Sequence, residues 1–437
     1  MTAALRTVAL YTADAWDNAL VHLRVRGPAA WAGVEVLPGN VGDAIDLAPV
    51  EAAQLVILQR DFPRFGPAYE AVAQSAQALG KPVVHELDDL LLDVPLDHWG
   101  KDAYTDYLFD LLGGLVAADG LVAATPALAE ALRPLNPSID VWPNCLDDRL
   151  WRLRPPAPCV APTPERPLVL GYMGGQTHQP DLAEITGALL RVLDRHKSTV
   201  RLQFWGGPPP EVLLGHPQVA WTALDVPGYA AFAAFFQAQQ FDVALAPLRD
   251  RPFNRCKSHI KFLEYSALGV PGVYSRLAPY AGIVTHGANG LLAATPEDWE
   301  AALVALIESP ALRDRLAHAA QATVADGWRL SARAGEWQAL YSRFVEPGRP
   351  PALLAAHRAS LASVGQRLRA HQVALQALLQ AEVRDSDQQL AELRAHPAWR
   401  LAQTLTRWRA RLAPDGSRRQ RFLDTLVRQF TPRPPAA

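Results

Sequence analysis

The chain has 437 residues, of which 49% are hydrophobic and 20% are charged, and its formal net charge is −2. These values are typical of a globular protein of two or three domains, and they exclude a disordered chain and bulk binding of nucleic acid. The three cysteines, Cys145, Cys159 and Cys256, show neither a disulfide framework nor paired metal-ligand spacing, which favours a reducing cytoplasm.

The beginning of the sequence lacks the features of an export signal. Residues 1–11 contain a short apolar run and are followed by Asp14 and Asp17, without an h-region or a small-residue cleavage site. No apolar run approaches the roughly 18 residues needed to span a bilayer. We therefore expect a cytoplasmic protein whose membrane contact is at most peripheral.

Residues 1–146 alternate short apolar runs with longer amphipathic segments. Helices are expected up to residue 31, up to residue 80, and over 125–135, where Thr125 is a candidate N-cap before Pro126. The expected strands are 7–11, 34–37, 55–59, 82–86, 120–124 and 139–142. Strands that alternate with helices predict a parallel sheet covered by helices.

A change of composition follows this first domain. Residues 147–167 contain six prolines, too many for a helix or a central strand, and we interpret them as a linker. The alternation then resumes and predicts a second doubly wound domain over 168–346. Its expected strands are 168–173, 200–205, 219–221, 241–246 and 272–275, and its expected helices follow Pro180 or lie near 229–239, 296–307, 311–325 and 331–344.

A group of charged residues follows the strand expected at 241–246. Lys257, Lys261 and Glu264 have the i, i+4, i+7 spacing of neighbours on one helical face, and Ser258 is a candidate N-cap of that helix. Two cations at a helix start suit a diphosphate, and the carboxylate one turn deeper suits the hydroxyls of a ribose. An ordinary surface pair of Lys261 and Glu264 remains the alternative.

The last ninety residues differ from both domains. Leucines recur every seven residues at Leu354, Leu361, Leu368 and Leu375, which predicts a heptad-like helix over 347–393 and a possible homo-oligomer through 352–393. Residues 394–437 carry ten arginines and two acidic residues among aromatic and aliphatic side chains. This composition is typical of a helix that lies on an anionic membrane surface; an interaction tail is the alternative.

The residues around Glu264 also carry a family resemblance. The run from Lys261 to Pro271, followed by Gly-Ala-Asn-Gly-Leu-Leu at 287–292, resembles the donor-binding signature of bacterial family-4 glycosyltransferases (glycosyl transferases group 1), which have the GT-B fold. Pro143-Asn144, the run 241–247 and the segment 297–299 are also similar. Segments 23–28, 85–89 and 171–178 are similar to a subgroup associated with surface polysaccharides.

The resemblance covers about residues 1–345 and implies a fold and an activity. The expected fold is an α/β GT-B fold, with two Rossmann-like doubly wound domains facing a cleft, plus a C-terminal helical extension. A nucleoside-diphosphate sugar, linked to UDP or GDP, would bind in the second domain and a glycan, lipid-linked or protein acceptor in the first, with no bound metal or other cofactor. In the retaining mechanism usually assigned to this fold, cationic side chains stabilise the leaving diphosphate while it helps to take the acceptor proton.

The same resemblance assigns roles to individual residues. Glu264 carries over as the ribose ligand, and Lys257, Lys261 and Arg255 are the candidate catalytic residues. The remaining candidate donor contacts are Gly174, Gly175, His178, Ser258 and Val226. A plain turn remains the alternative for the two glycines.

Two departures from the family pattern affect this assignment. The family commonly has a second glutamate eight positions before the ribose glutamate, where this chain has Cys256, and a thiol cannot replace a carboxylate. We interpret Cys256 as a packing residue rather than a nucleophile. The chain also lacks the usual Arg and Lys after the first strand of the second domain. His178 and a basic cluster would replace them; the cluster consists of Arg249, Arg251, Arg255, Lys257 and Lys261.

Candidate acceptor contacts lie in the first domain: Arg24, Arg26, Asp88, Asp89 and His98. Each has a structural alternative. The arginines can be a solvated pair, the aspartates can cap the next segment, and the histidine can be a packing residue. A metal site at the aspartates is disfavoured because no third ligand has an evident spacing.

We therefore expect a retaining glycosyltransferase (EC 2.4) that acts in surface-polysaccharide or glycoconjugate assembly at the inner face of the cytoplasmic membrane. The alternative from another class is a catalytically silent GT-B scaffold that binds a nucleotide or glycan, and Cys256 is its best support. An epimerase of the same fold is disfavoured, because the additional carboxylates and histidines that it needs cannot be placed.

Overall fold

The structure is a computed structural model, and its description covers residues 5–41, 44–98 and 101–346 without gaps. Individual helical residues are also described at 373, 377, 379–381, 383–392, 394, 395, 397 and 399. The chain divides into two units, Met1–Gly365 and Gln366–Ala437. In the second unit the described residues are helical and exposed.

Most of the predicted C-terminal features lie outside the described residues. These include the heptad leucines, Leu354, Leu361, Leu368 and Leu375, and all of the predicted basic tail except residues 394, 395, 397 and 399. Trp399 is exposed. Among the described residues, no helix combines the length and the apolar character that crossing a membrane requires.

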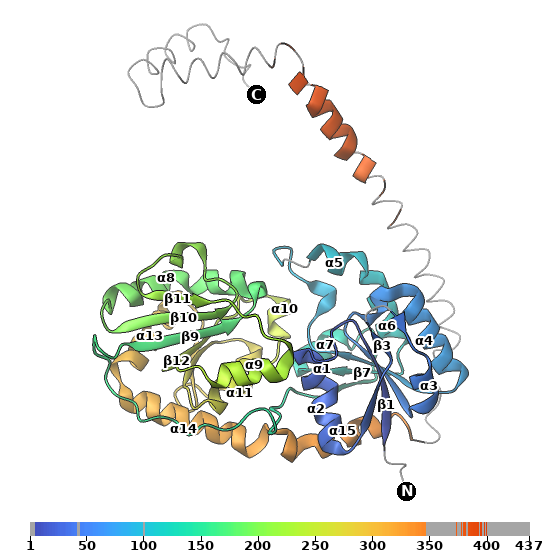
Figure 1. The fold of residues 1–437 in the computed structure, drawn as a ribbon, viewed down its shortest axis with the longest axis horizontal. Coiled ribbons are helices and arrows are strands. Elements are labelled where there is room, and N and C mark those ends of the chain that lie inside the picture. Colours follow the sequence, from blue (N-terminus) through green and yellow to red (C-terminus); the bar gives the residue numbers. More distant parts are fainter. Residues whose placement is uncertain are drawn as a thin grey trace. The chain divides into compact units, whose positions relative to one another are not determined.

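The first unit contains two α/β domains, each built on a six-stranded sheet (Figure 1). In the first domain all strands of the large sheet are parallel and the order is β2-β1-β5-β6-β7-β8. The strand bounds are β1 Thr7–Thr12, β2 Glu35–Pro38, β5 Leu55–Gln59, β6 Val83–Leu87, β7 Gly120–Ala123 and β8 Ile139–Val141. A separate antiparallel pair is formed by β3 Asn40–Val41 and β4 Ala44–Ile45. Strands β5, β6 and β7 are buried throughout, as expected for a parallel sheet covered on both faces.

The first-domain helices connect these strands. Their bounds are α1 Ala19–Val21, α2 Gly27–Ala32, α3 Ala48–Ala52, α4 Gly66–Ala78, α5 Lys101–Asp106, α6 Leu108–Ala117 and α7 Pro126–Leu132. A π-helical turn, His22–Arg26, joins α1 to α2. Thr125 is the N-cap of α7 and its hydroxyl accepts a hydrogen bond from Leu128 N (3.1 Å), as predicted. The sequence pattern did not indicate α3, α5, α6, β3 or β4.

The second domain has the parallel order β11-β10-β9-β12-β13-β14. The direction of winding reverses between β9 and β12, and ligands of such sheets bind beyond the carboxyl ends of the strands at this point. The strand bounds are β9 Leu168–Gly174, β10 Val200–Gly206, β11 Val219–Thr222, β12 Val243–Ala246, β13 Gly272–Ser275 and β14 Leu291–Ala293. The helix bounds are α8 Gln179–Arg195, α9 Gly228–Gln237, α10 Pro252–Arg255, α11 Ile260–Ala267, α12 Ala278–Ala281, α13 Pro296–Glu308 and α14 Pro310–Gly327.

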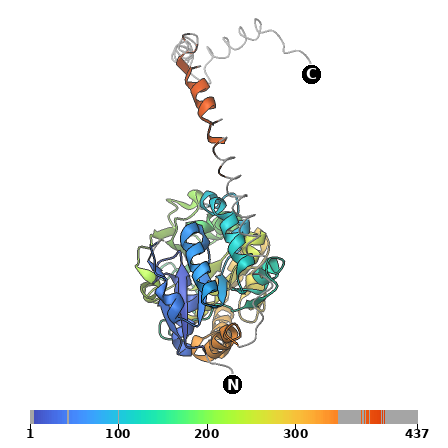
Figure 2. The same cartoon turned by 90° about the vertical axis from the view of Figure 1, so that its right-hand side faces the viewer.

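The last helix of this unit, α15 (Leu330–Ser342), packs on the first domain. Trp337 and Tyr341 are buried in the same apolar cluster as Val8 and Val25, and the indole of Trp337 donates a hydrogen bond to Arg24 O (3.2 Å). Figures 1 and 2 both show the orange α15 beside the blue first domain. The range 168–346 predicted for the second domain therefore includes a helix that completes the core of the first. The periodicity of a helix shows that it has an apolar face, but not which core receives that face.

The proline-rich segment is extended and runs along the surface of the second domain. Residues 151–163 contain no helix or strand, and Arg154 N donates to Ala267 O (2.8 Å). The buried Trp151 donates its indole N–H to the hydroxyl of Tyr229 (2.9 Å). These contacts hold the segment against α9 and α11.

Candidate active site

Glycines shape the carboxyl ends of β9 and β10. Gly207 N donates to Gly174 O (2.7 Å), and a Cβ on Gly206, whose φ is +96°, would lie 2.5 Å from the same oxygen. A Cβ on Gly175 would meet no atom closer than 4.0 Å. Gly174 therefore serves the close packing of two strand ends, whereas Gly175 faces open space where a ligand could approach the backbone.

Lys261 and Glu264 lie on α11 near the end of β9, where Lys261 is half-buried and Glu264 is buried. Lys261 Nζ donates to Met173 O (2.7 Å), and Glu264 is 7% exposed. Burial lowers the pKa of Lys261 to about 8 and raises the pKa of Glu264 to about 7, although each charge favours ionisation of the other. The Glu264 carboxylate has no protein hydrogen-bond donor among the described residues. An ordinary solvated surface pair is therefore excluded.

Lys257 does not lie on this helix. The structure starts α11 at Ile260, so the predicted stripe of three charged residues on one helical face is wrong for Lys257. Its ammonium group instead lies 3.4 Å from both carboxylate oxygens of Asp89 and 4.5 Å from the ring centroid of Phe253. Lys257 thus joins the second domain to the first.

Ser258 is not the N-cap of α11. The N-cap is His259, which makes no capping hydrogen bond through its side chain. The Ser258 hydroxyl accepts a hydrogen bond from Asn144 Nδ2 (2.9 Å) at the end of the first domain. The prediction failed because the segment before α11 follows the contact between the domains rather than the local capping preference.

His178 lies at the start of α8 and is held by Asp181. Its Nδ1 is 2.7 Å from Asp181 Oδ2, and burial lowers its pKa to about 4. Because a carboxylate only accepts hydrogen bonds, the neutral ring carries its proton on Nδ1 and presents Nε2 as an acceptor. Nε2 of His178 is therefore suited to accept a hydrogen bond from a sugar hydroxyl. Because the ring is neutral, His178 is not suited to replace a cation at a diphosphate.

Asp181 is a site residue that the sequence analysis missed. It is 3% exposed, and its Oδ1 accepts hydrogen bonds from Arg249 N (2.9 Å) and Asn254 Nδ2 (2.7 Å). It thereby connects the start of α8 to the segment after β12. The available signal was a carboxylate directly after Pro180, in the first turn of a predicted helix.

Two neighbouring residues of this segment lie outside the cleft: Arg255 is exposed to solvent, and Cys256 is buried in an apolar core. Arg255 forms a bidentate pair with Asp250, its side chain is 58% exposed, and its predicted catalytic role is not supported by this position. Cys256 is buried in an apolar cluster with Leu87 and Phe253, and burial raises the pKa of its thiol to about 11. The interpretation of Cys256 as a packing residue agrees with this environment.

The facing edge of the first domain is charged. Arg60 follows β5 directly and pairs with Asp88; its Nε is 3.4 Å from Asp14 Oδ2, and its Nη2 is 3.3 Å from the hydroxyl of Tyr104. Arg60 has φ +52° and is the one non-glycine residue with a positive φ in the described part of the chain. A bulky side chain in this region is costly, so the surrounding ion pairs must hold it there. Arg60 was not among the predicted site residues, although a charged residue directly after a predicted buried strand was a signal for it.

The two aspartates differ in their ionisation. Burial raises the pKa of Asp88 to about 6 despite Arg60, whereas Lys257 and Arg60 together lower the pKa of Asp89 in opposition to its burial. Asp89 is therefore the anionic group that meets the second domain. His98 is half-buried at the same cleft, where it lies beside Phe253 and Tyr104.

Neither predicted arginine of the segment 23–28 reaches the cleft as an acceptor ligand. Arg24 is fully buried and donates to Glu86 Oε1 (2.6 Å), Trp142 O (2.5 Å) and Asn144 Oδ1 (2.9 Å). Arg26 donates to Trp16 O (2.7 Å) and lies over the ring of Trp16. Both assignments are corrected: the π-helical turn directs Arg24 into the core, where it ties β6 to the segment after β8.

Val226 is half-buried between β11 and α9, and its donor contact stays a prediction. Among the described residues, no group of three or more His, Cys, Asp or Glu side chains is arranged to hold a metal ion. That the reaction needs no metal also stays a prediction.

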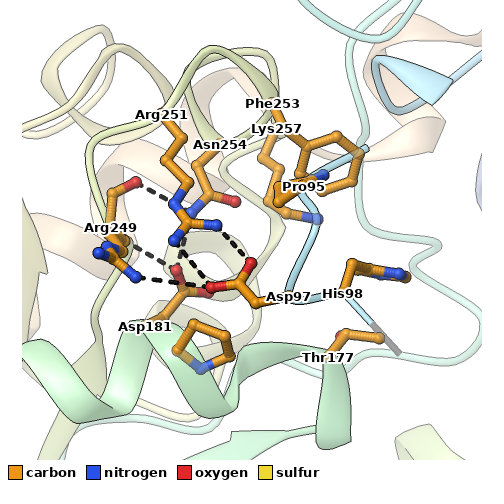
Figure 3. Close-up of a pocket in the computed structure, with 11 residues that line it drawn as sticks. Pro95, Asp97, His98, Thr177, Asp181, Arg249, Arg251, Phe253, Asn254 and Lys257 are labelled. Carbon is orange, nitrogen blue, oxygen red and sulfur yellow. Dashed lines mark hydrogen bonds and ion pairs between the residues drawn. The ribbon is translucent and has the colours of Figure 1, made fainter. Parts of the chain in front are cut away.

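A pocket at the domain interface brings several of these residues together (Figure 3). It is small, about 20 Å³, and lies between the first-domain loop that carries His98 and the second-domain segments around Thr177 and Lys257. Asp97 of that loop accepts a bidentate hydrogen bond from Arg251, with Oδ2 2.8 Å from Nη2, and lies 3.6 Å from Arg249 Nη1. Lys257 and His98 line this pocket, while Asp89 pairs with Lys257 and His178 pairs with the lining residue Asp181. Lys261 lies outside it, at the end of β9.

Comparison with known proteins defines the class to which this cleft belongs. The glycosyl transferases group 1 family matches residues 167–309, which span the second domain from β9 to the end of α13. The resemblance and the class of enzyme, a glycosyltransferase, are thereby confirmed for the domain that carries Lys261 and Glu264. No curated protein sequence matches the chain significantly.

Solved structures confirm the GT-B fold of both domains. HepE from Anabaena, in complex with UDP and glucose, is 15% identical with a TM-score of 0.53, over 78% of this chain and 100% of that one. Sucrose-phosphate synthase from Thermosynechococcus elongatus is 15% identical with a TM-score of 0.55, over 77% and 98%. The lipopolysaccharide outer core galactosyltransferase WaaB is 13% identical with a TM-score of 0.50, over 77% and 99%. Identities this low establish the fold and nothing finer.

Proposed function

We propose that the protein transfers a sugar, with retention of configuration, from a nucleoside diphosphate to an acceptor in surface-polysaccharide or glycoconjugate assembly. The observation that carries this proposal is the juxtaposition of the half-buried Lys261 and the buried Glu264 beyond the end of β9, at the point where the sheet reverses its direction of winding. A solved HepE structure of the same fold contains UDP and glucose, which supports a nucleotide sugar as the donor class.

Glu264 is the proposed ribose ligand. Glu264 is a buried residue whose carboxylate has no protein hydrogen-bond donor within the described part of the chain, so its oxygens are available to a ligand that supplies donors. Two vicinal hydroxyls of a ribose would supply them. Ionised Glu264 would accept both hydrogen bonds and so orient the nucleoside.

Lys261 and Lys257 are the proposed stabilisers of the leaving diphosphate. Lys261 is fixed by Met173 O, and Lys257 is fixed by Asp89, so that both cations are positioned before a ligand arrives. Preorganised charge of this kind stabilises the negative charge that develops as the glycosidic bond to the diphosphate breaks. In the retaining reaction the departing diphosphate oxygen would take the proton of the acceptor hydroxyl, and these lysines would hold that oxygen in place.

The acceptor would approach from the first domain. Asp89, Asp88 and His98 lie there, and Arg60 fixes the position of Asp88. The anionic Asp89 also neutralises Lys257, which limits the attraction of unspecific anions to the cleft. A metal ion has no part in this scheme.

The test is a thermal-shift screen of UDP-, GDP-, ADP- and CMP-sugars, because a ligand that binds only the folded state raises the melting temperature. The donor that binds is then titrated against Glu264→Ala and against Glu297→Ala, a control on the exposed start of α13. We expect Glu264→Ala to weaken binding at least tenfold and Glu297→Ala to have no effect. Equal affinities for both variants would remove the ribose assignment.

Turnover separates the enzyme from the scaffold alternative. The identified donor is incubated with a membrane extract of acceptors, and release of free nucleoside diphosphate is measured with wild type and Lys261→Ala. We expect Lys261→Ala to lower kcat more than donor affinity, since its charge is needed most in the transition state. Binding without any turnover in wild type would favour the scaffold.

A further inference from the structure

We propose that Arg249 and Arg251 form a subsite for an anionic group of the acceptor, a phosphate or a carboxylate, and that the Asp97 carboxylate occupies this subsite in the structure. The acceptor assignment rests on the function proposed above. The subsite itself rests on the geometry of three side chains at the mouth of the cleft (Figure 3).

The two guanidinium groups converge on one anion. Asp97 accepts from both terminal nitrogens of Arg251, and Arg249 Nη1 is 3.6 Å from Asp97 Oδ2. Planar, bidentate recognition of this kind is shared by carboxylates and phosphates, so the Asp97 carboxylate shows which ligand chemistry the arginines accept.

The Asp97 pair is weak enough to be displaced. The Asp97 side chain is 42% exposed and that of Arg251 is 25% exposed, and ion pairs in contact with water contribute little to stability. Asp97 also belongs to the opposite domain, on the loop between β6 and α5. An incoming anion can therefore replace it without leaving a buried charge uncompensated, since the displaced Asp97 is already in contact with water.

The two lysines near the cleft are assigned to the donor diphosphate, and their contacts differ from those of the arginine pair. Lys257 pairs with Asp89, and Lys261 binds a backbone oxygen beside Glu264. Lys261 and Glu264 do not line this pocket, whereas Arg249, Arg251, His98 and Lys257 do. The arginine pair is thus separate from the proposed ribose position and lies toward the first domain, where the acceptor is expected.

Hydrogen bonds hold the backbone of Arg249 in place, which supports a preorganised binding site. Arg249 N donates to the buried Asp181, and Asn254 Nδ2 donates both to Asp181 and to Arg249 O (2.9 Å). Glu184 Oε1 forms an ion pair with Arg249 Nε (2.8 Å), and Arg249 Nη1 lies 3.6 Å from Asp97 Oδ2. The segment between β12 and α10 is therefore held in place before a ligand binds.

The test titrates inorganic phosphate by calorimetry at low ionic strength, with and without the nucleotide that binds at Glu264. Asp97→Asn removes the internal competitor, and Arg251→Gln removes the bidentate ligand. Arg255→Gln is the matched control, since Arg255 is a neighbouring arginine that pairs with Asp250 outside the pocket. Glucuronate and glucose are titrated in parallel to distinguish a carboxylate from a phosphate ligand.

We expect Asp97→Asn to strengthen phosphate or glucuronate binding by about five- to tenfold and Arg251→Gln to abolish it, with Arg255→Gln like wild type. Glucose should not bind at this position. Equal losses of anion affinity in Arg251→Gln and Arg255→Gln, or no gain of anion affinity in Asp97→Asn, would overturn the proposed subsite. Phosphate binding that the nucleotide removes would also overturn it, because the arginines would then hold the donor diphosphate.

The anion subsite and the proposed donor site can fail separately in this experiment. If no nucleotide binds to wild type, the proposed function fails, but phosphate binding that depends on Arg251 and not on Arg255 would still establish the anion subsite. If nucleotide binds through Glu264 and no variant alters phosphate binding, only the subsite fails.

Discussion

Lys257 and Asp89 meet across the two domains, with the lysine Nζ 3.4 Å from each carboxylate oxygen. Both side chains are largely buried, at 18% and 21% exposure. The pair holds a proposed catalytic cation of the second domain against a proposed acceptor residue of the first. It therefore connects domain closure directly to the arrangement of the site.

Removal of one partner of this pair should destabilise the protein more than removal of both. We expect Lys257→Ala to cost about 1–3 kcal/mol, because Asp89 would remain buried without its nearest cation, and Asp89→Asn to restore part of the loss in the double variant. Denaturant unfolding of the four proteins of the double-mutant cycle measures this coupling. Additive losses would show that the two side chains do not interact.

Nucleotide affinity should be greatest between about pH 7 and pH 8. Glu264, whose pKa is raised to about 7, must lose its proton to accept ribose hydroxyls, and Lys261, whose pKa is lowered to about 8, must keep its proton to meet the diphosphate. We expect affinity to fall about fivefold from pH 7 to pH 6 in wild type. Calorimetric titrations across pH with Glu264→Gln provide the comparison, since ionisation of the ligand is common to both proteins. An acid limb that persists in Glu264→Gln would assign it to another group.

Ionisation of Glu264 should also lower the free energy of unfolding as the pH rises. Its folded pKa is raised above the unfolded value, so the folded state binds the extra proton and the free energy of unfolding falls as the pH rises from about 4.5 to 7. Glu264→Gln removes this contribution. The free energy of unfolding of the variant, relative to that of wild type, should therefore increase as the pH rises from about 4.5 to 7. Denaturant unfolding at pH 5 and pH 7 measures the difference, and a constant difference would contradict the raised pKa.

Arg60 should be required for Asp88 to remain charged. Burial already raises the pKa of Asp88 to about 6, and loss of the Arg60 cation should raise it further. At pH 7 we expect Arg60→Ala to cost about 1–3 kcal/mol, with partial recovery in the double variant with Asp88→Asn. Arg60→Gly is the matched variant, because glycine adopts φ +52° without strain and should lose about 1 kcal/mol less than alanine. Equal stability of the alanine and glycine variants would show that the backbone at residue 60 is unstrained.

Cys256 should behave as a packing residue and not as a nucleophile. Burial raises the pKa of its thiol to about 11, so thiol reagents at pH 8 should modify it far more slowly than the half-buried Cys159. Cys256→Ala should retain kcat within about threefold, since no reacting group is lost. Cys256→Glu should lower the melting temperature, because it places a carboxylate in the apolar cluster around Phe253. Mass spectrometry of labelled peptides and thermal melts measure these effects; a large loss of kcat in Cys256→Ala would contradict the packing role.

The basic segment 394–437 remains a prediction from composition. Deletion of these residues should release the protein from anionic liposomes and leave transfer to a water-soluble acceptor unchanged, because ten arginines supply the electrostatic attraction. Cosedimentation with anionic and with zwitterionic vesicles measures binding. Undiminished binding after the deletion would place the membrane contact elsewhere.

The sequence determined the architecture because that information is local. Apolar runs alternating with amphipathic segments were sufficient to predict the strands β5 and β13 at their observed bounds, and the motif around Glu264 was sufficient to predict the domain that the family comparison confirms. Thr125 was predicted as an N-cap from its neighbours alone, since capping depends on a few consecutive residues.

Only the tertiary structure decided which charged residues share a site. Lys257 pairs with a residue 168 positions away, Asp97 pairs with a residue 154 positions away, and Arg24 is turned into a core by a π-helical turn. Spacing along one chain cannot show such contacts, because they depend on how two sheets face each other. For the same reason α15 could be predicted as a helix but not assigned to the first domain, whose core it completes. Local pattern thus determined the secondary structure and the donor motif, whereas the arrangement of the cleft followed from long-range packing and charge.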